Sequence, residues 1–368
     1  MKLSTYIKIT VSVVVSLLLG AFCSVGYASS DTPTDPRYSK YKFEKGKNVI
    51  NVGVQPMSVP QIIITETMSR DVVLYNTLKE LGMEIKFFPF LKGFDINYFL
   101  LKGDLQAGVS GDAPTVVAAS TDKVIVASLM QYGFTSIVGS KHLKIKNLRN
   151  AIIGYAFGSN AHYALLNALS IGGGTPKSGN LVKMDVTEMV DSLKNHKIEA
   201  FSAWEPTVTE ALTTLRGVDV IYSKVTTGYL YFGKDLYTSR PDVIDALVAS
   251  ELRALRWLQK DNNNLLTAVK WASDKQASFT GKASPLTTDQ IADIALNDLV
   301  GMMTNPRLPI SEFKENGILY NEFNFLKSIG LIQSTVSLDV VYKNFVSDII
   351  ERIVANPKKY KLNEYQYK

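Results

Sequence analysis

Three short apolar runs in this chain end in small polar residues and lead directly into a helical pattern. They are VSGDAP at 109–114, FGSNAH at 157–162 and FSAWEP at 201–206. A strand that ends this way leaves unpaired backbone N–H groups in a crevice, and the positive end of the following helix points there too. One such junction is common. Three of them, about 45 residues apart, predict a crevice lined with helix N-termini that holds a small anionic solute.

Strand and helix patterns alternate along most of the chain. Apolar strands at 48–54, 83–88, 105–109 and 124–129 are separated by helical patterns, the first of them at 62–81, and a second alternation runs from 139 to 222. This order is typical of parallel-rich α/β sheets covered by helices. The chain is also longer than one core usually supports. We predict an α/β fold of two lobes with a hinge, 48–138 plus 231–368 as lobe 1 and 139–230 as lobe 2, with a mainly helical C-terminal part.

The first residues have the pattern of a signal peptide. Lys2 and Lys8 precede or flank an apolar run at 9–23, and Gly26-Tyr27-Ala28 has small residues at the −3 and −1 positions of a cleavage site. We therefore expect residues 1–28 to be removed on export and the protein to be periplasmic, with an uncleaved membrane anchor as the alternative. Residues 29–47 are polar and are predicted to be a tether or a loosely packed arm.

Composition excludes several kinds of site. The single cysteine, Cys23, lies in the predicted signal peptide, so the mature chain would have no disulfide, cysteine nucleophile or thiolate metal site. The three histidines are far apart in sequence, and we expect no metal site and no cofactor. Without the signal peptide, 38 basic residues face 34 acidic ones, a net charge of +4. The lysines are scattered along the sequence, which does not predict nucleic-acid binding.

Four motifs together carry a resemblance to a known family. They are NVGVQP at 51–56, GVSGDAP at 108–114, GSNAHYALLNAL at 158–169 and IEAFSAWEP at 198–206. In this order and spacing they resemble the nitrate/sulfonate/taurine-type solute-binding proteins of ABC importers, with the aliphatic sulfonate-like branch favoured. The resemblance covers roughly 48–335. It implies a type II periplasmic-binding fold, a cleft ligand that bears an oxyanion, and delivery to an ABC permease in the inner membrane; we expect a monomer.

The resemblance also implies ligand-binding positions where the motifs match. They are the residue after the first strand and the residues around the three junctions: Gln55; Gly111, Asp112 and Ala113; Ser159, Asn160, Ala161 and His162; Trp204 and Glu205. The chain departs from the common family pattern at Met57 and Ser58, which leaves the organic part of the ligand open.

Several of these residues also have a structural interpretation. Ser159 and Asn160 are favoured N-caps, which does not exclude ligand binding. His162 is either a packing residue or a ligand contact. Trp204 is either a core residue or the apolar wall of the site. Asp112 would repel an anion, so we expect it to cap the helix or to accept hydrogen bonds from neighbouring backbone.

Glu205 precedes Pro206, which suits the first position of a helix. Glu is not a favoured N-cap, so the position mildly favours a functional carboxylate, for instance a partner for an ammonium or hydroxyl group of the ligand.

Three function classes remain open from the sequence. The leading one is a binding protein without chemistry, a two-lobed trap that closes on its solute. The alternative is an enzyme on the same fold, for pyrimidine-precursor synthesis or carbon–sulfur cleavage, and His162 with Glu205 is the one acid–base pair that the sequence offers it. A signalling module that presents a ligand to a receptor is the third.

Overall fold

The computed structural model describes residues 33–46, 48–175, 180–299 and 308–368. The predicted signal peptide and residues 29–32 and 47 of the predicted arm lie outside them. The described residues all belong to one compact unit, 33–368. None of the described helices is long and apolar enough to cross a membrane.

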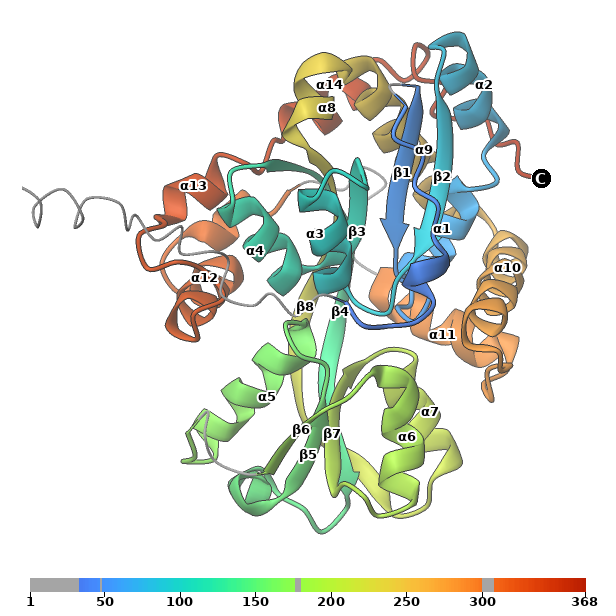
Figure 1. Ribbon diagram of the computed structural model, residues 1–368. Helices are drawn as coiled ribbons and strands as arrows, with labels where there is room; N and C mark the ends of the chain where they lie inside the picture. The colour runs from blue at the N-terminus through green and yellow to red at the C-terminus, as the bar shows by residue number, and fades with distance from the viewer. Residues whose placement is uncertain (1–32, 47, 176–179, 300–307) are drawn as a thin grey trace, which may run out of the picture. The chain divides into compact units, whose positions relative to one another are not determined.

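One sheet of eight strands runs through this unit, in the order β2-β1-β3-β8-β4-β7-β5-β6 (Figure 1). Its strands are β1 (Val49–Val54), β2 (Glu84–Pro89), β3 (Ala107–Gly111), β4 (Val124–Ser140), β5 (Ile152–Tyr155), β6 (Asn180–Lys183), β7 (Ala200–Trp204) and β8 (Val218–Gly233). Strand β1 is parallel to β2 and β3, and β5 is parallel to β6 and β7. The two long strands β4 and β8 are antiparallel to each other.

Strands β4 and β8 connect the two parallel parts of the sheet. The later half of β8 pairs with β3, whereas the later half of β4 pairs with β7. The sequence predicted shorter strands here, at 124–129 and 219–222, because polar residues such as Gln131 and Thr226 interrupt the apolar runs. These residues are buried in the middle of the long strands.

The helices of lobe 1 are α1 (Gln61–Met68), α2 (Val72–Glu80), α3 (Gly93–Leu101), α4 (Asp112–Ser120), α8 (Lys234–Ser239), α9 (Pro241–Lys260), α10 (Asn262–Thr280), α11 (Thr288–Leu299), α12 (Ile318–Ser328), α13 (Leu338–Tyr342) and α14 (Asp348–Ala355). The single helix predicted at 62–81 is wrong, because α1 and α2 are separate. α1 ends at Met68, and Asp71 caps α2, since its side chain accepts hydrogen bonds from the N–H groups of Val73 and Leu74.

Lobe 2 contains α5 (Asn160–Ile171) on one face of β5–β7 and α6 (Val186–Lys194) and α7 (Thr207–Thr214) on the other (Figure 1). Each face has its own small core, one around Leu165 and Leu169 and one around Met189 and Phe201. The much larger core of lobe 1 is a third cluster. Separate cores on either side of the crossing strands are what the predicted two-lobed fold requires, while the predicted residue boundaries of the lobes remain an interpretation.

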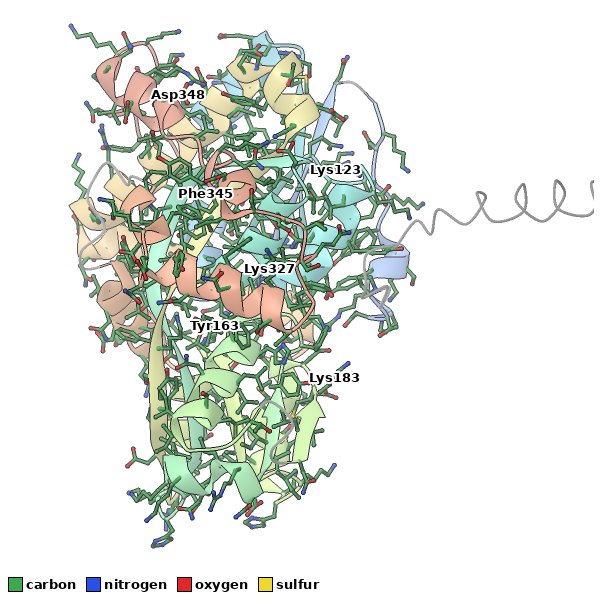
Figure 2. All side chains as sticks on the ribbon, turned by 90° about the vertical axis from the view of Figure 1, so that its left-hand side faces the viewer. Lys123, Tyr163, Lys183, Lys327, Phe345 and Asp348 are labelled. Atoms are coloured by element: carbon green, nitrogen blue, oxygen red, sulfur yellow. The ribbon has the colours of Figure 1, made fainter. Side chains whose placement is uncertain are left out.

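Two contacts, one from residues 33–46 and one between α5 and α12, add to this description of the two lobes. Residues 33–46 are not a loosely packed arm, because the Tyr38 hydroxyl donates to Asp95 Oδ2 at 2.8 Å and accepts from the Leu91 N–H at 2.8 Å. Tyr38 is buried in the core of lobe 1. On another face, the ring of Tyr163 in α5 (Figure 2) lies 4.5 Å from the ring of Phe325 in α12, which joins lobe 2 to the C-terminal helices.

Candidate functional site

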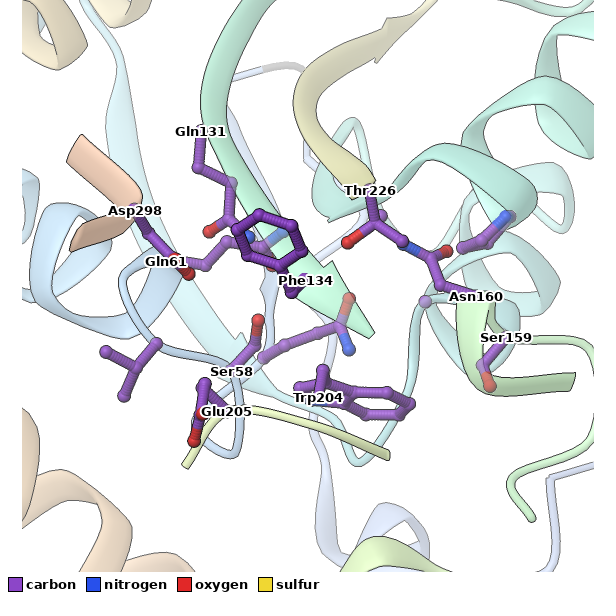
Figure 3. Close-up of a pocket in the computed structure, with 15 residues that line it drawn as sticks. Ser58, Gln61, Gln131, Phe134, Ser159, Asn160, Trp204, Glu205, Thr226 and Asp298 are labelled. Atoms are coloured by element: carbon purple, nitrogen blue, oxygen red, sulfur yellow. The ribbon is translucent and has the colours of Figure 1, made fainter. Parts of the chain in front are cut away.

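A small cavity lies where the parallel strands end and where β4 and β8 cross between the lobes (Figure 3). The space open to the centre of a water-sized sphere is about 30 Å³. Its lining residues come from both lobes and from the crossing strands: Gln55, Ser58, Val59, Gln61, Gly93, Gly111, Pro114, Gln131, Phe134, Ser159, Asn160, Trp204, Glu205, Thr226 and Asp298. The cavity is therefore an inter-lobe site at the carboxyl ends of strands, the position expected for ligands of open α/β sheets.

The cavity is surrounded by helix N-termini. The sequence predicted three, and the structure brings five helices, α1, α3, α4, α5 and α7, to within two residues of a lining position. The additional ones are α1, reached through Gln61, and α3, reached through Gly93. Helix N-termini present N–H groups and partial positive charge, so the backbone around this cavity favours an anionic group.

Asn160 connects two of these N-termini. Its Oδ1 accepts a hydrogen bond from the Ala113 N–H in α4, at 3.2 Å, across the lobes. Gly111 makes this approach possible, because a Cβ there would lie 2.4 Å from Asn160 Nδ2. Since the N–H of Ala113 is a donor, the Asn160 atom that faces it must be the oxygen. The amide nitrogen Nδ2 is then the donor that Asn160 can offer to a solute.

Ser159 lines the cavity as the N-cap of α5. Its Oγ accepts from the Ala161 N–H at 3.2 Å and donates to the Ala156 carbonyl at 2.6 Å. The hydroxyl proton is thus used within the protein, and capping is the role that this geometry favours.

Four of the ten predicted positions do not line the cavity. Ala113 and Ala161 are buried, and Asp112 turns toward β8, where its Oδ2 accepts from the N–H of Thr227 at 2.9 Å. Its Oδ1 accepts from the neighbouring Ala113 N–H at 3.0 Å, which is the kind of bond expected for Asp112, whereas the bond to β8 was not expected. His162 packs between the rings of Tyr155 and Phe157, with centroids 4.7 and 5.2 Å away.

Burial lowers the pKa of His162 to about 4, so it is neutral at physiological pH. Packing is therefore the interpretation of His162 that the structure favours.

Trp204 and Glu205 hold the lobes together at one side of the cavity. The Trp204 Nε1 donates to the Met57 carbonyl at 2.7 Å, and the Glu205 carbonyl accepts from the Val59 N–H at 3.1 Å. The indole ring faces the cavity (Figure 3). The residue type at position 57 matters through its side chain, because Met57 packs against the lobe 2 core that contains Phe201.

Pro206, and not Glu205, is the N-cap residue of α7, so α7 begins one residue later than the sequence predicted. The Glu205 carboxylate nevertheless bonds the first turn of α7. It accepts hydrogen bonds from the N–H and the hydroxyl of Thr209, each at 3.0 Å. Burial nevertheless raises its pKa above the ordinary value.

Asp298 of α11 is a second carboxyl group at the cavity, on the same side as Glu205 and away from Ser159 and Asn160 (Figure 3). Burial, and then the charge of Glu205, raise its pKa to about 7. Its Oδ2 lies against β4, where a Cβ at Gly133 would be 2.7 Å away. Among the described residues, no lysine, arginine or histidine lines the cavity. The side with Glu205 and Asp298 therefore has carboxyl groups beside the N-termini of α1 and α7, whereas the side with Ser159 and Asn160 has helix N-termini without a carboxyl group that lines the cavity.

Sequence reasoning missed Asp298, Gln61, Gln131 and Phe134. The Oε1 atoms of Gln61 and Gln131 are buried and have no hydrogen-bond partner within the described part of the chain. Gln131 and Phe134 lie in the part of β4 that was not predicted as strand, and Asp298 follows the junctions by about 90 residues. The one sequence feature that could have identified any of them is the polar residue Gln131 between apolar residues of β4.

No protein-family model matches the chain. The taurine-binding periplasmic protein of Escherichia coli (strain K12) is 26% identical over 203 residues, which cover 50% of this chain and 63% of that protein. The chain thus aligns with less than two thirds of the length of this relative.

Solved structures show the same fold. The alkanesulfonate-binding protein SsuA from Xanthomonas axonopodis pv. citri, bound to MOPS, superposes with a TM-score of 0.60 over 80% of this chain and 97% of its own, at 15% identity. The aliphatic sulphonate binding protein SsuA from Escherichia coli gives 0.59 over 80% and 92%, at 14% identity.

The desulfurization enzyme DSZB also has this fold, with a TM-score of 0.56 over 84% of this chain and 99% of its own, at 12% identity. The predicted fold and the predicted resemblance to the sulfonate/taurine-type binding proteins are confirmed, while the fold by itself is compatible with both binding and catalysis.

Proposed function

We propose that this chain is the extracytoplasmic solute-binding component of an ABC import system and holds a small sulfonate-like or taurine-like solute between its lobes. The observation that carries the proposal is the inter-lobe cavity, which lies at the start of five helices in a fold shared with sulfonate-binding proteins. Helix N-termini can bind an oxyanion without a cationic side chain, and no basic side chain lines the cavity within the described residues.

The solute would lie with its two ends in different surroundings. Its oxyanion would face Asn160 Nδ2 and the N-termini of α4 and α5. Glu205 and Asp298 on the other side would repel a second negative group and attract an ammonium group. The unpartnered Oε1 atoms of Gln61 and Gln131 are acceptors, and they suit the ammonium end of the solute, which donates hydrogen bonds. An amino-sulfonate therefore fits the cavity better than nitrate or sulfate does.

Binding fits better than catalysis because the one acid–base pair nominated from the sequence is not assembled. His162 packs against Tyr155 and Phe157, whereas Glu205 faces the cavity and bonds the first turn of α7. General acid–base catalysis needs both groups within reach of the reacting atoms. We therefore favour a solute that is held and released unchanged, then passed to a permease in the inner membrane.

Calorimetry of the mature protein tests this proposal, with taurine, ethanesulfonate, sulfate, nitrate and ethylammonium as solutes. We expect taurine to bind most tightly, ethanesulfonate more weakly, and sulfate and nitrate weakest. Recovery of unaltered taurine after incubation would support binding without chemistry. Binding of ethylammonium alone would contradict the anion site, and conversion of a sulfonate would support the enzyme alternative.

Export is the second part of the proposal. Cleavage after Ala28 predicts Ser29 as the N-terminal residue of the protein purified from the periplasm, which N-terminal sequencing or intact mass measures. A mature protein that retains Lys2 would contradict export by a cleaved signal peptide.

A further inference from the structure

The end of lobe 2 away from the cavity gathers exposed basic side chains that lie far apart in sequence. Four come from the loop between β4 and β5, namely Lys141, Lys144, Lys146 and Arg149. All four are exposed. Basic residues that are scattered along the sequence thus come together on this part of the surface.

Two further segments add three more exposed basic residues: Lys194 at the end of α6, Lys197 after it, and Arg216 after α7. The loops meet, because Lys194 and Arg216 line the same surface hollow of about 820 Å³ and the Lys141 N–H donates to the Gly217 carbonyl at 2.9 Å. We call these seven residues the cationic end. Figure 2 shows side chains extending outward from this lower end of the molecule.

The charges of the cationic end are not neutralised within the protein. None of the seven residues forms an ion pair with any described residue. Two acidic residues lie beside them, Glu199 before β7 and Asp219 at the start of β8. Glu199 accepts from the Ile152 N–H at 2.9 Å and Asp219 from the Val220 N–H at 2.8 Å, so both carboxylates bond backbone rather than a basic side chain of the cationic end, whose seven positive charges outnumber them.

Lobe 1 has some exposed lysines that are paired, for example Lys45 with Asp104 at 2.8 Å and Lys102 with Asp104 at 3.4 Å, and its other described exposed lysines are not gathered on adjoining loops in this way. An unpaired group of this size creates a local positive potential that extends about 8 Å at physiological salt.

The kind of partner follows from what these loops lack. Protein interfaces are usually anchored by buried aromatic side chains, and the stretches 140–150, 193–199 and 214–219 contain no Phe, Tyr or Trp. Lysine side chains on several loops suit a fluid anionic surface, which adjusts to them without shape complementarity. We propose that the cationic end binds the anionic headgroup surface of a phospholipid bilayer. This interaction is independent of the proposed solute and of the permease.

Co-sedimentation with vesicles tests the proposal. The mature protein is mixed at 50 and 200 mM salt with vesicles of phosphatidylcholine alone or with one third phosphatidylglycerol. We expect binding to the anionic vesicles only, and a marked loss at the higher salt. Absence of binding to anionic vesicles at 50 mM salt would overturn the proposal.

A matched pair of triple variants separates the cationic end from net charge. Lys144→Gln, Lys146→Gln and Lys194→Gln together should lower the partition coefficient about 100-fold, since each basic residue near an anionic surface contributes about fivefold. The control is the triple replacement by Gln at Lys270, Lys358 and Lys359, which are also exposed and lose the same charge. Equal losses in both triples would show that net charge alone drives binding and would overturn the assignment.

Two further measurements complete the test. Solute affinity should be unchanged in the first triple variant, because its replaced residues lie outside the cavity. If the protein bound native membranes but not protein-free anionic vesicles, and protease treatment of the membranes abolished that binding, the partner would be a protein and the lipid proposal would be wrong.

Discussion

Taurine binding should release a proton from Asp298. Its pKa of about 7 means that half of the molecules are protonated there at pH 7. An ammonium group within a few ångströms lowers the pKa of a carboxyl group by about 1–3 units. With a shift of about 2 units, to about 5, the bound state is almost fully ionised. About half a proton is therefore released per taurine at pH 7.

The same shift fixes the pH dependence of affinity. Protonation of Asp298 removes the charge that attracts the ammonium group, so affinity should rise with pH, by about tenfold between pH 6 and pH 8 for a shift of about 2 units. An oxyanion without an amine should behave in the opposite way and bind less tightly as Asp298 ionises. Ethanesulfonate is thus a control of the same charge at its anionic end.

Calorimetry in buffers of different ionisation enthalpy measures the number of protons released. Asp298→Asn should abolish the release and flatten the pH dependence, because it keeps the shape and removes the titrating group. Gly133→Ala is a second check, since its Cβ would displace the Asp298 carboxylate. Proton uptake with taurine, or equal heats in all buffers for the parent protein, would refute the placement of the ammonium group beside Asp298.

Three other changes have definite expected outcomes. Asn160→Asp should weaken sulfonate binding about 100-fold or more, because it replaces the donor Nδ2 by a negatively charged oxygen. The stability of the protein should not fall, because a negative charge is favourable at a helix N-terminus. Calorimetry checks the affinity and thermal melting checks the stability. Glu251→Gln should reduce the loss of stability between about pH 5 and pH 8. Burial raises the pKa of Glu251 to about 8, so its stabilisation is lost, at about 1.4 kcal/mol per pH unit, as pH rises from about 4.5 toward 8; identical melting profiles of the two proteins from pH 5 to 9 would contradict this. Asp71→Asn should lower the free energy of unfolding in urea by about 3–5 kcal/mol, because it leaves the buried Arg253, 2.6 Å away, without its charged partner. A decrease below about 1 kcal/mol would contradict this.

The sequence by itself determined the elements and where they meet. Short apolar runs that end in Gly, Ser or Asn specify strands that feed helices, since these residues suit the turns and caps of such junctions. Ligands of α/β sheets lie beyond the carboxyl ends of strands, so the three junctions were expected at the ligand. Gly111 follows one parallel set and Ser159 and Trp204 the other, and these carboxyl ends face each other across one cavity.

Only the tertiary structure decided which side chains face the cavity and what charge it has. Asp112 lies within a predicted motif but accepts a hydrogen bond from Thr227 of β8. The two residues are far apart in sequence, so local patterns could not predict this contact. Asp298 contributes the second carboxyl group from α11, where helical periodicity identifies a buried face but not its neighbour.

The position of the cationic end was likewise decided by the tertiary structure. Lys141, Lys194 and Arg216 lie on segments that are brought together by the packing of α6 and α7 on the sheet. Local patterns depend on residues a few positions apart, whereas the electrostatics of a site or surface sum over charges that only folding brings within a Debye length of one another.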